Sequence, residues 1–315
     1  MEFKYGDKIA TREAYGKSLA ELGARRDFVV LDADLAEATK TIHFKKAFPE
    51  RFFDCGIAEG NMVGIAAGLA AAGKPVFAST FAMFAAGRAF EQIRNSVAYP
   101  HLNVKIAATH AGITVGEDGA THQCLEDLAL MRVIPGMTVV NPSDAVEAAA
   151  VLEAALDNDG PFYIRFGRNA VPVIHTEDYK FELGRGELIR DGKDATVVAT
   201  GMMVSLALEA AEKLEAEGIS VRVINIHTIK PLDTEIIVSA AKETGAIVTA
   251  EEHNIIGGLG SAVAETLAGN CPVPMLRVGV EDTFGRSGKV APLLQMYGLT
   301  ADNIADKVRR VINMK

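Results

Sequence analysis

The sequence of 315 residues has no tryptophan, only three cysteines and no run of about 18 apolar residues uninterrupted by a charge. Cys55, Cys124 and Cys271 lie far apart and form no CxxC pair, which argues against a disulfide framework and a zinc knot. The lack of a long apolar run argues against a membrane-spanning helix. The polar opening segment does not resemble a secretory signal, so we expect a cytoplasmic protein.

Basic residues are also in deficit, because 32 Lys and Arg face 41 Asp and Glu and leave a formal charge of −9. A phosphate backbone selects a basic protein face, so neither a nucleic acid nor an anionic membrane is expected as the main partner. A local basic pocket for one small phosphate is compatible with this charge. Hydrophobic residues make up 49% of the chain, which is enough for a large buried core without disulfides or metals.

Short apolar runs alternate with helix-like segments along the chain, and this pattern is typical of βαβ units with a parallel sheet. It fades between residues 169 and 192 and then starts again. We therefore predict an α/β fold with two domains, each with a mostly parallel sheet flanked by helices. The predicted ranges are 1–175 for the first domain, 176–190 for a linker and 191–315 for the second domain.

Within the first domain, we expect helices over residues 8–22 and 58–72, the former with Thr11 as a candidate N-cap. A further helix is expected after Pro142, capped by Ser143 or Asp144. The expected strands are 28–32, 52–56, 76–80, 104–110, 138–141 and 162–166.

An isolated acid and a pair of aromatic residues stand out in otherwise apolar segments. Glu59 begins an expected helix, where an acid can simply favour the positive end of the helix dipole. Alternatively, it is a carboxyl group in a dry site that shares a proton with a ring nitrogen. Phe81 and Phe84 have the spacing of one helix face, which is typical of a core, but such a pair can also stack on a flat heterocycle.

A glycine-rich polar segment, THAGITVGEDGATHQ at residues 109–123, follows an expected strand. It holds His110, Glu117, Asp118 and His122, and loops at the carboxyl ends of parallel strands are where α/β proteins bind ligands. A solvated turn is the alternative. The spacing matches no zinc motif, and no metal site is expected in this chain.

Three arginines could lie near this loop. Arg165 and Arg168 are at the end of the expected strand 162–166, and Arg12 is in the first expected helix. Arginines usually are solvated or pair with surface acids. If these converge at the strand ends, they form a bidentate clamp for a phosphate or a carboxylate.

A second glycine-rich turn, GGLG at residues 257–260, lies between an expected strand and an expected helix. With Glu281 and Asp282 downstream, it is a weak match to a dinucleotide site, and close packing is the favoured interpretation. The sequence has no GxxxxGK[ST] loop. It also lacks the Gly-Asp-Gly pattern with a downstream Asn that holds a diphosphate through a divalent metal.

Together these segments resemble the transketolase family over essentially the whole chain. The stretch THAGITVGEDGATHQ resembles the family's TH…G.GEDGPTHQ loop, and STFAMF resembles its STF-x-x-F segment. IAEGNMVGIAAGLA resembles the glutamate helix of thiamine diphosphate enzymes, and EEHNIIGGLGS resembles the signature of the C-terminal domain. The resemblance covers only the pyrimidine-binding and C-terminal domains of the family.

The resemblance implies a role for each matching residue. Glu59 would bond the aminopyrimidine nitrogen of thiamine diphosphate and promote the ylide that carries a two-carbon unit. Phe81 and Phe84 would stack on the pyrimidine, and Asp34 would lie near the cofactor at a subunit interface. His122 would also lie beside the reacting carbonyl. The residues implied in binding the sugar phosphate are Arg12, His110, Asp118, His122 and Arg168.

The sequence departs from the family pattern at three positions and lacks one domain. Ala38 stands where a serine helps to hold the phosphate, Gly87 where an aromatic is common, and Ala111 where an acid is common. The missing diphosphate-binding domain implies a separate N-terminal subunit that carries the Mg²⁺ ligands. Two copies of each subunit are expected, with a homodimer of this chain at the core of a heterotetramer.

The expected activity is that of a thiamine diphosphate-dependent transketolase, active only with its partner subunit, which moves a ketol unit from a ketose phosphate to an aldose phosphate. One alternative is another thiamine diphosphate enzyme, either deoxyxylulose-phosphate synthase-like or a 2-oxo-acid dehydrogenase β subunit. The other is a non-catalytic regulatory partner. His110 and the GEDGATHQ run argue against the first alternative, and retention of Glu59 and both loop histidines argues against the second.

Overall fold

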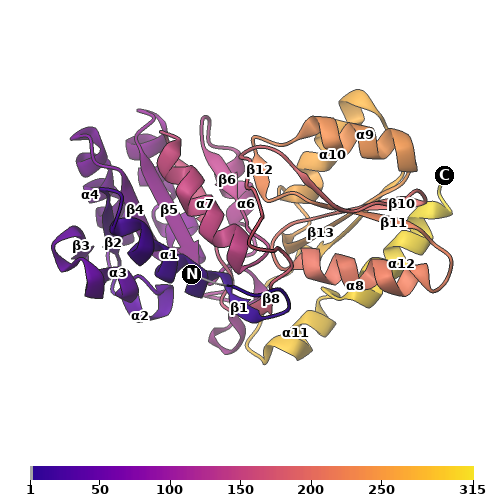
Figure 1. Cartoon of the computed structure of the whole chain (residues 1–315), viewed down its shortest axis with the longest axis horizontal. Coiled ribbons are helices and arrows are strands. Elements are labelled where there is room, and N and C mark those ends of the chain that lie inside the picture. Colours follow the sequence, from indigo (N-terminus) through magenta and orange to yellow (C-terminus); the bar gives the residue numbers. More distant parts are fainter. Residues whose placement is uncertain (1–2) are drawn as a thin grey trace.

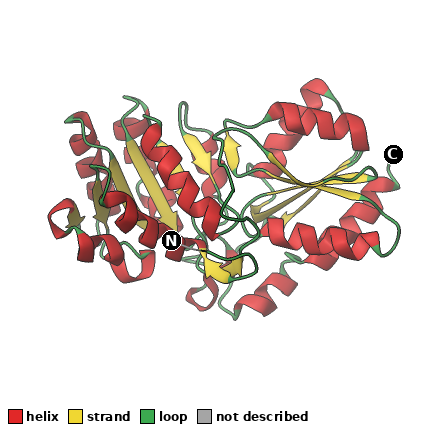
Figure 2. Ribbon diagram, viewed as in Figure 1, coloured by secondary structure: helices red, strands yellow, loops and turns green. Residues whose placement is uncertain are grey.

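The computed structural model describes residues 3–315 and shows two α/β units side by side (Figure 1). Figure 2 shows strands in the middle of each unit and helices around them. The elements of the first unit are β1 (Lys8–Ala10), α1 (Thr11–Gly23), β2 (Val29–Asp32), α2 (Ala36–Thr39), α3 (Ile42–Ala47), η1 (Pro49–Arg51), β3 (Phe52–Asp54), α4 (Glu59–Ala71), β4 (Val76–Phe81), η2 (Phe84–Arg88), α5 (Phe90–Gln92), η3 (Ile93–Ala98), β5 (Val104–Thr109), η4 (Ile113–Asp118), α6 (Asp127–Arg132), β6 (Thr138–Val140), α7 (Ala145–Asp157), β7 (Phe162–Arg165) and β8 (Ala170–Pro172).

The first sheet has seven strands in the order β12-β6-β7-β5-β4-β2-β3, in which β12 (Thr228–Lys230) comes from the second unit. All six strands expected from the sequence are present in it, and they run parallel to one another. Strands β4 and β5 are buried along their whole length, which explains their nearly continuous apolar sequences. Because the strands are parallel, their carboxyl ends share one edge of the sheet, as the site hypothesis requires.

The structure differs from the expected start of the first helix and confirms the expected cap of the helix after Pro142. Helix α1 begins at Thr11 rather than Lys8, because residues 8–10 form β1 and pair with β8. Thr11 is therefore not the N-cap, and its hydroxyl instead accepts a hydrogen bond from the Gly167 N–H at 2.8 Å. Asp144 does cap α7, since its carboxylate accepts from the Glu147 N–H at 2.9 Å.

The second unit contains a five-stranded sheet in the order β14-β13-β10-β11-β9, in which only β9 is antiparallel to its neighbour. Strand β9 lies in the range expected for the linker, and β12 leaves the second unit to pair with β6. The elements are β9 (Glu187–Arg190), β10 (Ala195–Ala199), α8 (Met203–Glu215), β11 (Val221–Asn225), β12 (Thr228–Lys230), α9 (Thr234–Thr244), β13 (Ile247–Asn254), α10 (Leu259–Asn270), β14 (Met275–Val280), α11 (Val290–Met296) and α12 (Ala301–Ile312).

The two units share one hydrophobic core. A single cluster of buried side chains runs from α4 and β4 in the first unit to α9 and α10 in the second. Two further clusters fill the outer faces of the two sheets. Burial of apolar area stabilises the contact between the two units, so residues on either side of this contact are held in fixed positions. Within residues 3–315, no helix combines the length and apolarity that a membrane crossing needs.

Candidate active site

The turn after β2 is organised by a buried carboxylate that the sequence did not single out. Asp32 accepts hydrogen bonds from the Leu35 N–H at 2.6 Å and from the hydroxyls of Thr39 and Thr41 at 2.7 and 2.8 Å. Burial raises the pKa of Asp32 to about 6 even though these bonds oppose it. The turn leaves Asp34 exposed at the carboxyl edge of the sheet with a left-handed backbone, φ 62°.

Glu59 is the first residue of α4 and its side chain is only 5% exposed. Within residues 3–315, its carboxylate accepts no hydrogen bond, and its one ion pair is with Arg88 Nη1 at 3.7 Å. A buried carboxylate without a hydrogen-bond donor is costly, so this group is suited to a donor supplied by a ligand. A contact with the helix dipole alone would not require the Glu59 side chain to be buried.

The aromatic pair is linked to this acid through Arg88 and packs against the loop histidines. The rings of Phe81 and Phe84 are stacked with centroids 5.7 Å apart, and the ring of His110 stacks on Phe81 at 3.8 Å. His122 meets Phe84 edge-on at 5.3 Å. Phe81 is buried and Phe84 is half-buried, so Phe84 offers the accessible ring.

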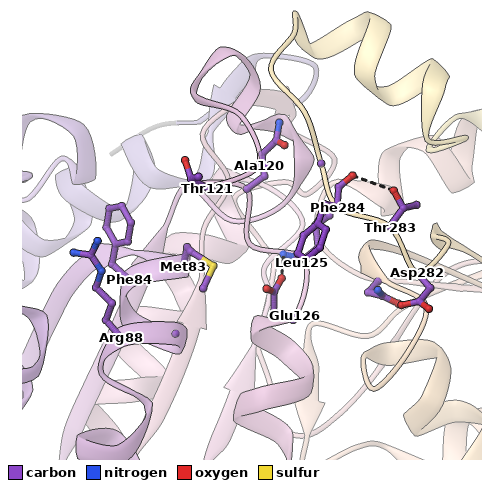
Figure 3. Close-up of a pocket in the computed structure, with 14 residues that line it drawn as sticks. Met83, Phe84, Arg88, Ala120, Thr121, Leu125, Glu126, Asp282, Thr283 and Phe284 are labelled. Carbon is purple, nitrogen blue, oxygen red and sulfur yellow. Dashed lines mark hydrogen bonds between the residues drawn. The ribbon is translucent and has the colours of Figure 1, made fainter.

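Phe84 faces a pocket of about 780 Å³ between the two units (Figure 3). Arg88 lies over the Phe84 ring at 4.9 Å, and Figure 3 shows both side chains on one side of the pocket, with Leu125 and Phe284 across from them. The pocket is therefore bounded by an aromatic ring and by the loop 282–285 of the second unit. A pocket of this size and mixed lining is typical of a small-molecule site.

The arginine clamp, which we define as Arg12, His110 and Arg168, forms at the same edge of the sheet. Arg12 Nη1 donates to the Ala38 carbonyl at 2.6 Å and lies 3.3 Å from His110 Nε2. Arg168 donates to the Val115 carbonyl. Arg12 and Arg168 line one cleft of about 280 Å³. Glu117 lines the same cleft and pairs with Arg168 Nη1 at 3.7 Å. Two guanidinium groups beside one carboxylate leave the cleft suited to an anion, which stays a prediction for these two arginines.

His110 is held neutral within the clamp. Burial and the charges of Arg12 and Arg168 lower the pKa of His110 to about 3. A guanidinium can only donate, so the contact assigns the Nε2 atom of His110 as an acceptor and places its proton on Nδ1, which lies 2.9 Å from the Thr109 hydroxyl. The left-handed φ of 55° at His110 is an unusual conformation of the kind that clusters at functional sites.

The remaining loop residues are less closely joined to this cluster. His122 is half-buried and its Nδ1 lies 3.0 Å from the Thr121 hydroxyl. Asp118 is exposed at the end of η4 and, within residues 3–315, forms no hydrogen bond or ion pair. The structure therefore joins Arg12 directly to His110 and places Arg168 in the same cleft as Arg12. The side chains of Asp118 and Asp34 form no hydrogen bond or ion pair within residues 3–315.

The expectation that Arg165 belongs to the clamp is wrong. Arg165 is buried, and its Nε donates to Asp127 Oδ2 at 2.7 Å. Its Nη2 donates to the Glu252 carbonyl at 2.9 Å, so this arginine connects the two units below the site. Burial would lower the pKa of Arg165, but the Asp127 carboxylate outweighs it and raises that pKa.

The dinucleotide interpretation of the GGLG turn is also wrong. The Glu251 carboxylate accepts from the N–H groups of Leu259 and Gly260 at 2.7 and 2.8 Å, where a diphosphate would have to bind. A Cβ atom at Gly258 would lie 2.0 Å from this carboxylate, so the glycine is needed for close packing. Close packing was the favoured interpretation of this turn.

Glu147, His175 and Glu187 form a cluster with the spacing of a metal site, but their bonds explain it otherwise. Both ring nitrogens of His175 bond carboxylates, Asp144 at 2.9 Å and Glu187 at 2.8 Å. Burial would lower the pKa of His175, but these two bonds raise it to about 10. Glu147 accepts from the Tyr179 hydroxyl at 2.5 Å. A protonated histidine between two acids ties the connecting segment to both units.

Comparison with known proteins agrees with this geometry. Residues 7–173 match the sequence model of the transketolase pyrimidine-binding domain, and residues 184–304 match that of the transketolase C-terminal domain. The chain belongs to the transketolase family.

Individual relatives show which part of the family the chain covers. A transketolase C-terminal section of Methanocaldococcus jannaschii is 52% identical over 301 residues, which are 94% of this chain and 94% of that protein. Human transketolase is 42% identical over 98% of this chain, which spans 50% of the human protein. A solved split-gene transketolase, described as an inactive beta4 tetramer, aligns with a TM-score of 0.90 and 55% identity over 98% of this chain and 100% of that one.

Proposed function

We propose that this chain is the C-terminal subunit of a split transketolase, which transfers a two-carbon ketol unit from a ketose phosphate to an aldose phosphate. The observation that carries the proposal is the position of His110. Its ring stacks on Phe81 at 3.8 Å while its Nε2 lies 3.3 Å from Arg12. One residue therefore joins a clamp for an anion to a platform for a flat ring, as a phosphosugar reaction on a heterocyclic cofactor requires.

The residues at the platform fit the aminopyrimidine ring of thiamine diphosphate. No residue in the described range 3–315 donates a hydrogen bond to the Glu59 carboxylate, and the Phe84 ring faces a pocket. Glu59 would hold a proton shared with a ring nitrogen, and Phe84 would stack on the ring. When bound, thiamine diphosphate supplies the electron sink that lets a carbon–carbon bond beside a carbonyl break.

The other site residues would bind and orient the sugar. Arg12 and Arg168 would hold the phosphate, and His110 would keep Arg12 in place without carrying a charge. His122, edge-on to Phe84, would hydrogen-bond the substrate carbonyl or move a proton there. Asp118 is free to accept from a sugar hydroxyl, and exposed Asp34 is free to face a subunit beside the cofactor.

The proposal includes a partner, an N-terminal subunit that carries the diphosphate-binding domain and the Mg²⁺ ligands. Half of human transketolase has no counterpart in this chain, and the similar split-gene structure is described as inactive. Both findings support a site completed by a second polypeptide. We propose a cytoplasmic heterotetramer with two copies of this chain at its core; the three free cysteines suit a reducing compartment.

The test is calorimetric titration of thiamine diphosphate, with Mg²⁺, into this chain alone and into its mixture with a candidate N-terminal subunit. Binding only in the mixture, followed by ketol transfer from a ketose phosphate, is the expected result. Tight binding to this chain alone would contradict the divided site. Turnover of pyruvate in place of a ketose phosphate would favour the deoxyxylulose-phosphate synthase-like or dehydrogenase alternative.

A further inference from the structure

A carboxylate of the second unit reaches into the loop that follows β5. Glu252, on β13, is buried, and its Oε1 accepts from the Thr114 N–H at 2.7 Å. The carboxylate lies flat against Gly112, where an added Cβ atom would be 2.3 Å from the Glu252 Cδ. Gly112 also has a φ of 82°, so the loop backbone is shaped around this side chain.

The same residue lines a cavity next to the chain neighbours of the two clamp arginines. A small enclosed polar cavity of about 20 Å³, large enough for one water molecule, is lined by Glu252, Thr11 and Gly167, among others. Thr11 and Gly167 precede Arg12 and Arg168 in the chain, and they are joined by a hydrogen bond of 2.8 Å. Glu252 thus contacts the loop and borders a cavity that is also lined by the residues preceding both arginines in the chain.

Two further bonds from the second unit hold the other end of the loop. The Ser287 hydroxyl donates to the Glu117 carbonyl at 2.6 Å, and the Gln123 amide donates to the Arg286 carbonyl at 2.9 Å. These partners lie in an exposed segment, whereas Glu252 is buried in a regular strand. A buried acceptor on a regular strand is held in place more firmly than one in an exposed segment, so we take Glu252 as the main support of the loop.

We propose that Glu252 is a positioning residue for sugar-phosphate binding, which fixes residues 112–118 against the arginine clamp from the second unit. It touches neither substrate nor cofactor in this proposal and acts through Thr114 and the loop backbone. The inference rests on the proposed function and assigns the second unit a part in substrate affinity. Burial raises the pKa of Glu252, against the opposing effect of Arg165, which agrees with a tightly enclosed group.

The chain offers a matched control in the neighbouring residue. Glu251 is equally buried on the same strand, but its side chain points to the start of α10 and bonds Leu259 and Gly260. Loss of either carboxylate leaves buried N–H groups without an acceptor, so both variants lose stability. Only the Glu252 variant is expected to disturb the clamp.

The experiment measures steady-state kinetics of Glu252→Ala and Glu251→Ala assembled with the N-terminal subunit. We expect Glu252→Ala to raise the KM for the ketose phosphate about tenfold with kcat within about threefold of wild type. Glu252→Gln, which keeps an acceptor for the Thr114 N–H, is expected to restore most of this loss. An unchanged KM in Glu252→Ala, or an equal rise in Glu251→Ala, would overturn the inference.

A second readout needs no activity and uses this chain alone. Hydrogen–deuterium exchange is expected to become faster in residues 111–123 for Glu252→Ala and in residues 255–263 for Glu251→Ala. If Glu252→Ala fails to fold, Glu252→Leu fills the volume without acceptor atoms and must give the same pattern. Absence of ketol transfer by the wild type would refute the proposed function, whereas unchanged loop exchange would refute the role of Glu252.

Discussion

The arginine clamp and the ring platform, which we define as Glu59 and Phe84, lie at one sheet edge but differ in how completely this chain holds them. In the clamp, Arg12 is fixed by the Ala38 carbonyl at 2.6 Å and by His110. In the platform, the one polar contact of the Glu59 carboxylate among the described residues 3–315 is with Arg88 at 3.7 Å, and the Arg88 side chain is 60% exposed.

This difference indicates that the chain by itself orders the proposed sugar-phosphate site more completely than the proposed cofactor site. A preformed clamp binds its anion without first ordering long side chains, so less of the binding energy is lost. The buried Glu59 carboxylate, with Arg88 at 3.7 Å, can instead accept a hydrogen bond from a bound ligand. We therefore expect substitutions to separate the two regions, with cofactor effects on one side and sugar-phosphate effects on the other.

The largest effect is expected at the platform. Glu59→Gln should lower ketol transfer by the assembled enzyme about a thousandfold, because a proton-sharing acid is lost, while sugar-phosphate affinity stays unchanged. The measurement is steady-state turnover, with size-exclusion chromatography to confirm that the variant still assembles. Near-normal turnover would support a non-catalytic role for this chain.

The support below the clamp should give the largest loss of stability. Arg165→Met leaves Asp127 buried without its partner, which is expected to cost about 3 to 5 kcal/mol of unfolding free energy. Urea unfolding of the chain measures this. Arg25→Met is the control, because Arg25 and Glu153 pair at 2.7 Å on the surface and their loss should cost less than about 1 kcal/mol. Similar losses in both variants would contradict the assignment of Arg165.

Within the clamp, Arg168→Ala should raise the KM for the sugar phosphate by about ten- to a hundredfold, because a charge-assisted hydrogen bond to the phosphate is lost. The affinity for thiamine diphosphate, measured by calorimetry in the assembled enzyme, should stay within about twofold. Arg168→Lys keeps the charge but not the bidentate geometry and should recover only part of the loss. An equal fall in cofactor affinity would show that clamp and platform are not separable.

The two buried histidines should respond to pH in different ways. With its pKa raised to about 10, His175 stabilises the fold fully below the unfolded value of about 6.5, and this stabilisation is lost as pH rises through about 10. The stability difference between wild type and His175→Gln should therefore shrink by about 3 to 4 kcal/mol from pH 7 to about pH 10.5.

Urea unfolding over this range measures the His175 effect, and a constant difference would contradict it. His110, with a pKa lowered to about 3, should show no titration in its NMR signals between about pH 5 and 9. Titration of His110 near neutral pH would mean that the clamp is more open than the structure shows.

The smallest effect is expected for Arg88→Met. Arg88 lies over the Phe84 ring at 4.9 Å and pairs with Glu59, so it competes for the place of a stacked ring. Because the Arg88 side chain is 60% exposed and the pair is 3.7 Å long, we expect the pair to contribute about 1 kcal/mol or less, so cofactor affinity should rise by no more than about fivefold. Calorimetry in the assembled enzyme measures this, and a tenfold weakening would instead place Arg88 among the residues that hold the cofactor.

Much of the fold could be predicted because parallel strands and crossover helices have strong local patterns. All six expected strands of the first sheet formed, and the loop after β5 carried its histidines to the strand ends. The start of α1 was less predictable, because residues 8–10 pair with β8, which lies about 160 positions away in the chain. Local propensity contains no information about such a partner.

The two arginines near β7 show which feature of the site could not be predicted from the sequence, namely the direction in which each side chain points. Arg165 and Arg168 are three positions apart in one motif, yet Arg168 lines the cleft and Arg165 pairs with Asp127 in the core. From the sequence, both arginines were equally suited to a clamp, because they are the same residue type at the end of the same strand. Adjacent Glu251 and Glu252 divide in the same way, because side chains on a strand alternate between its two faces.

The sequence alone was sufficient for the α/β class, for the segments that meet at one sheet edge and for the resemblance to transketolases. Only the packed structure decided that Arg168 reaches the cleft while Arg165 does not. It also decided that the Glu251 carboxylate bonds the GGLG turn and that the Glu252 carboxylate bonds the loop after β5. The physical reason is that these assignments depend on pairs such as Arg12 with His110 and Thr114 with Glu252, which are 98 and 138 positions apart. The contact of Arg12 with His110 exists only once the first sheet has formed, and that of Thr114 with Glu252 only once the two units have packed together.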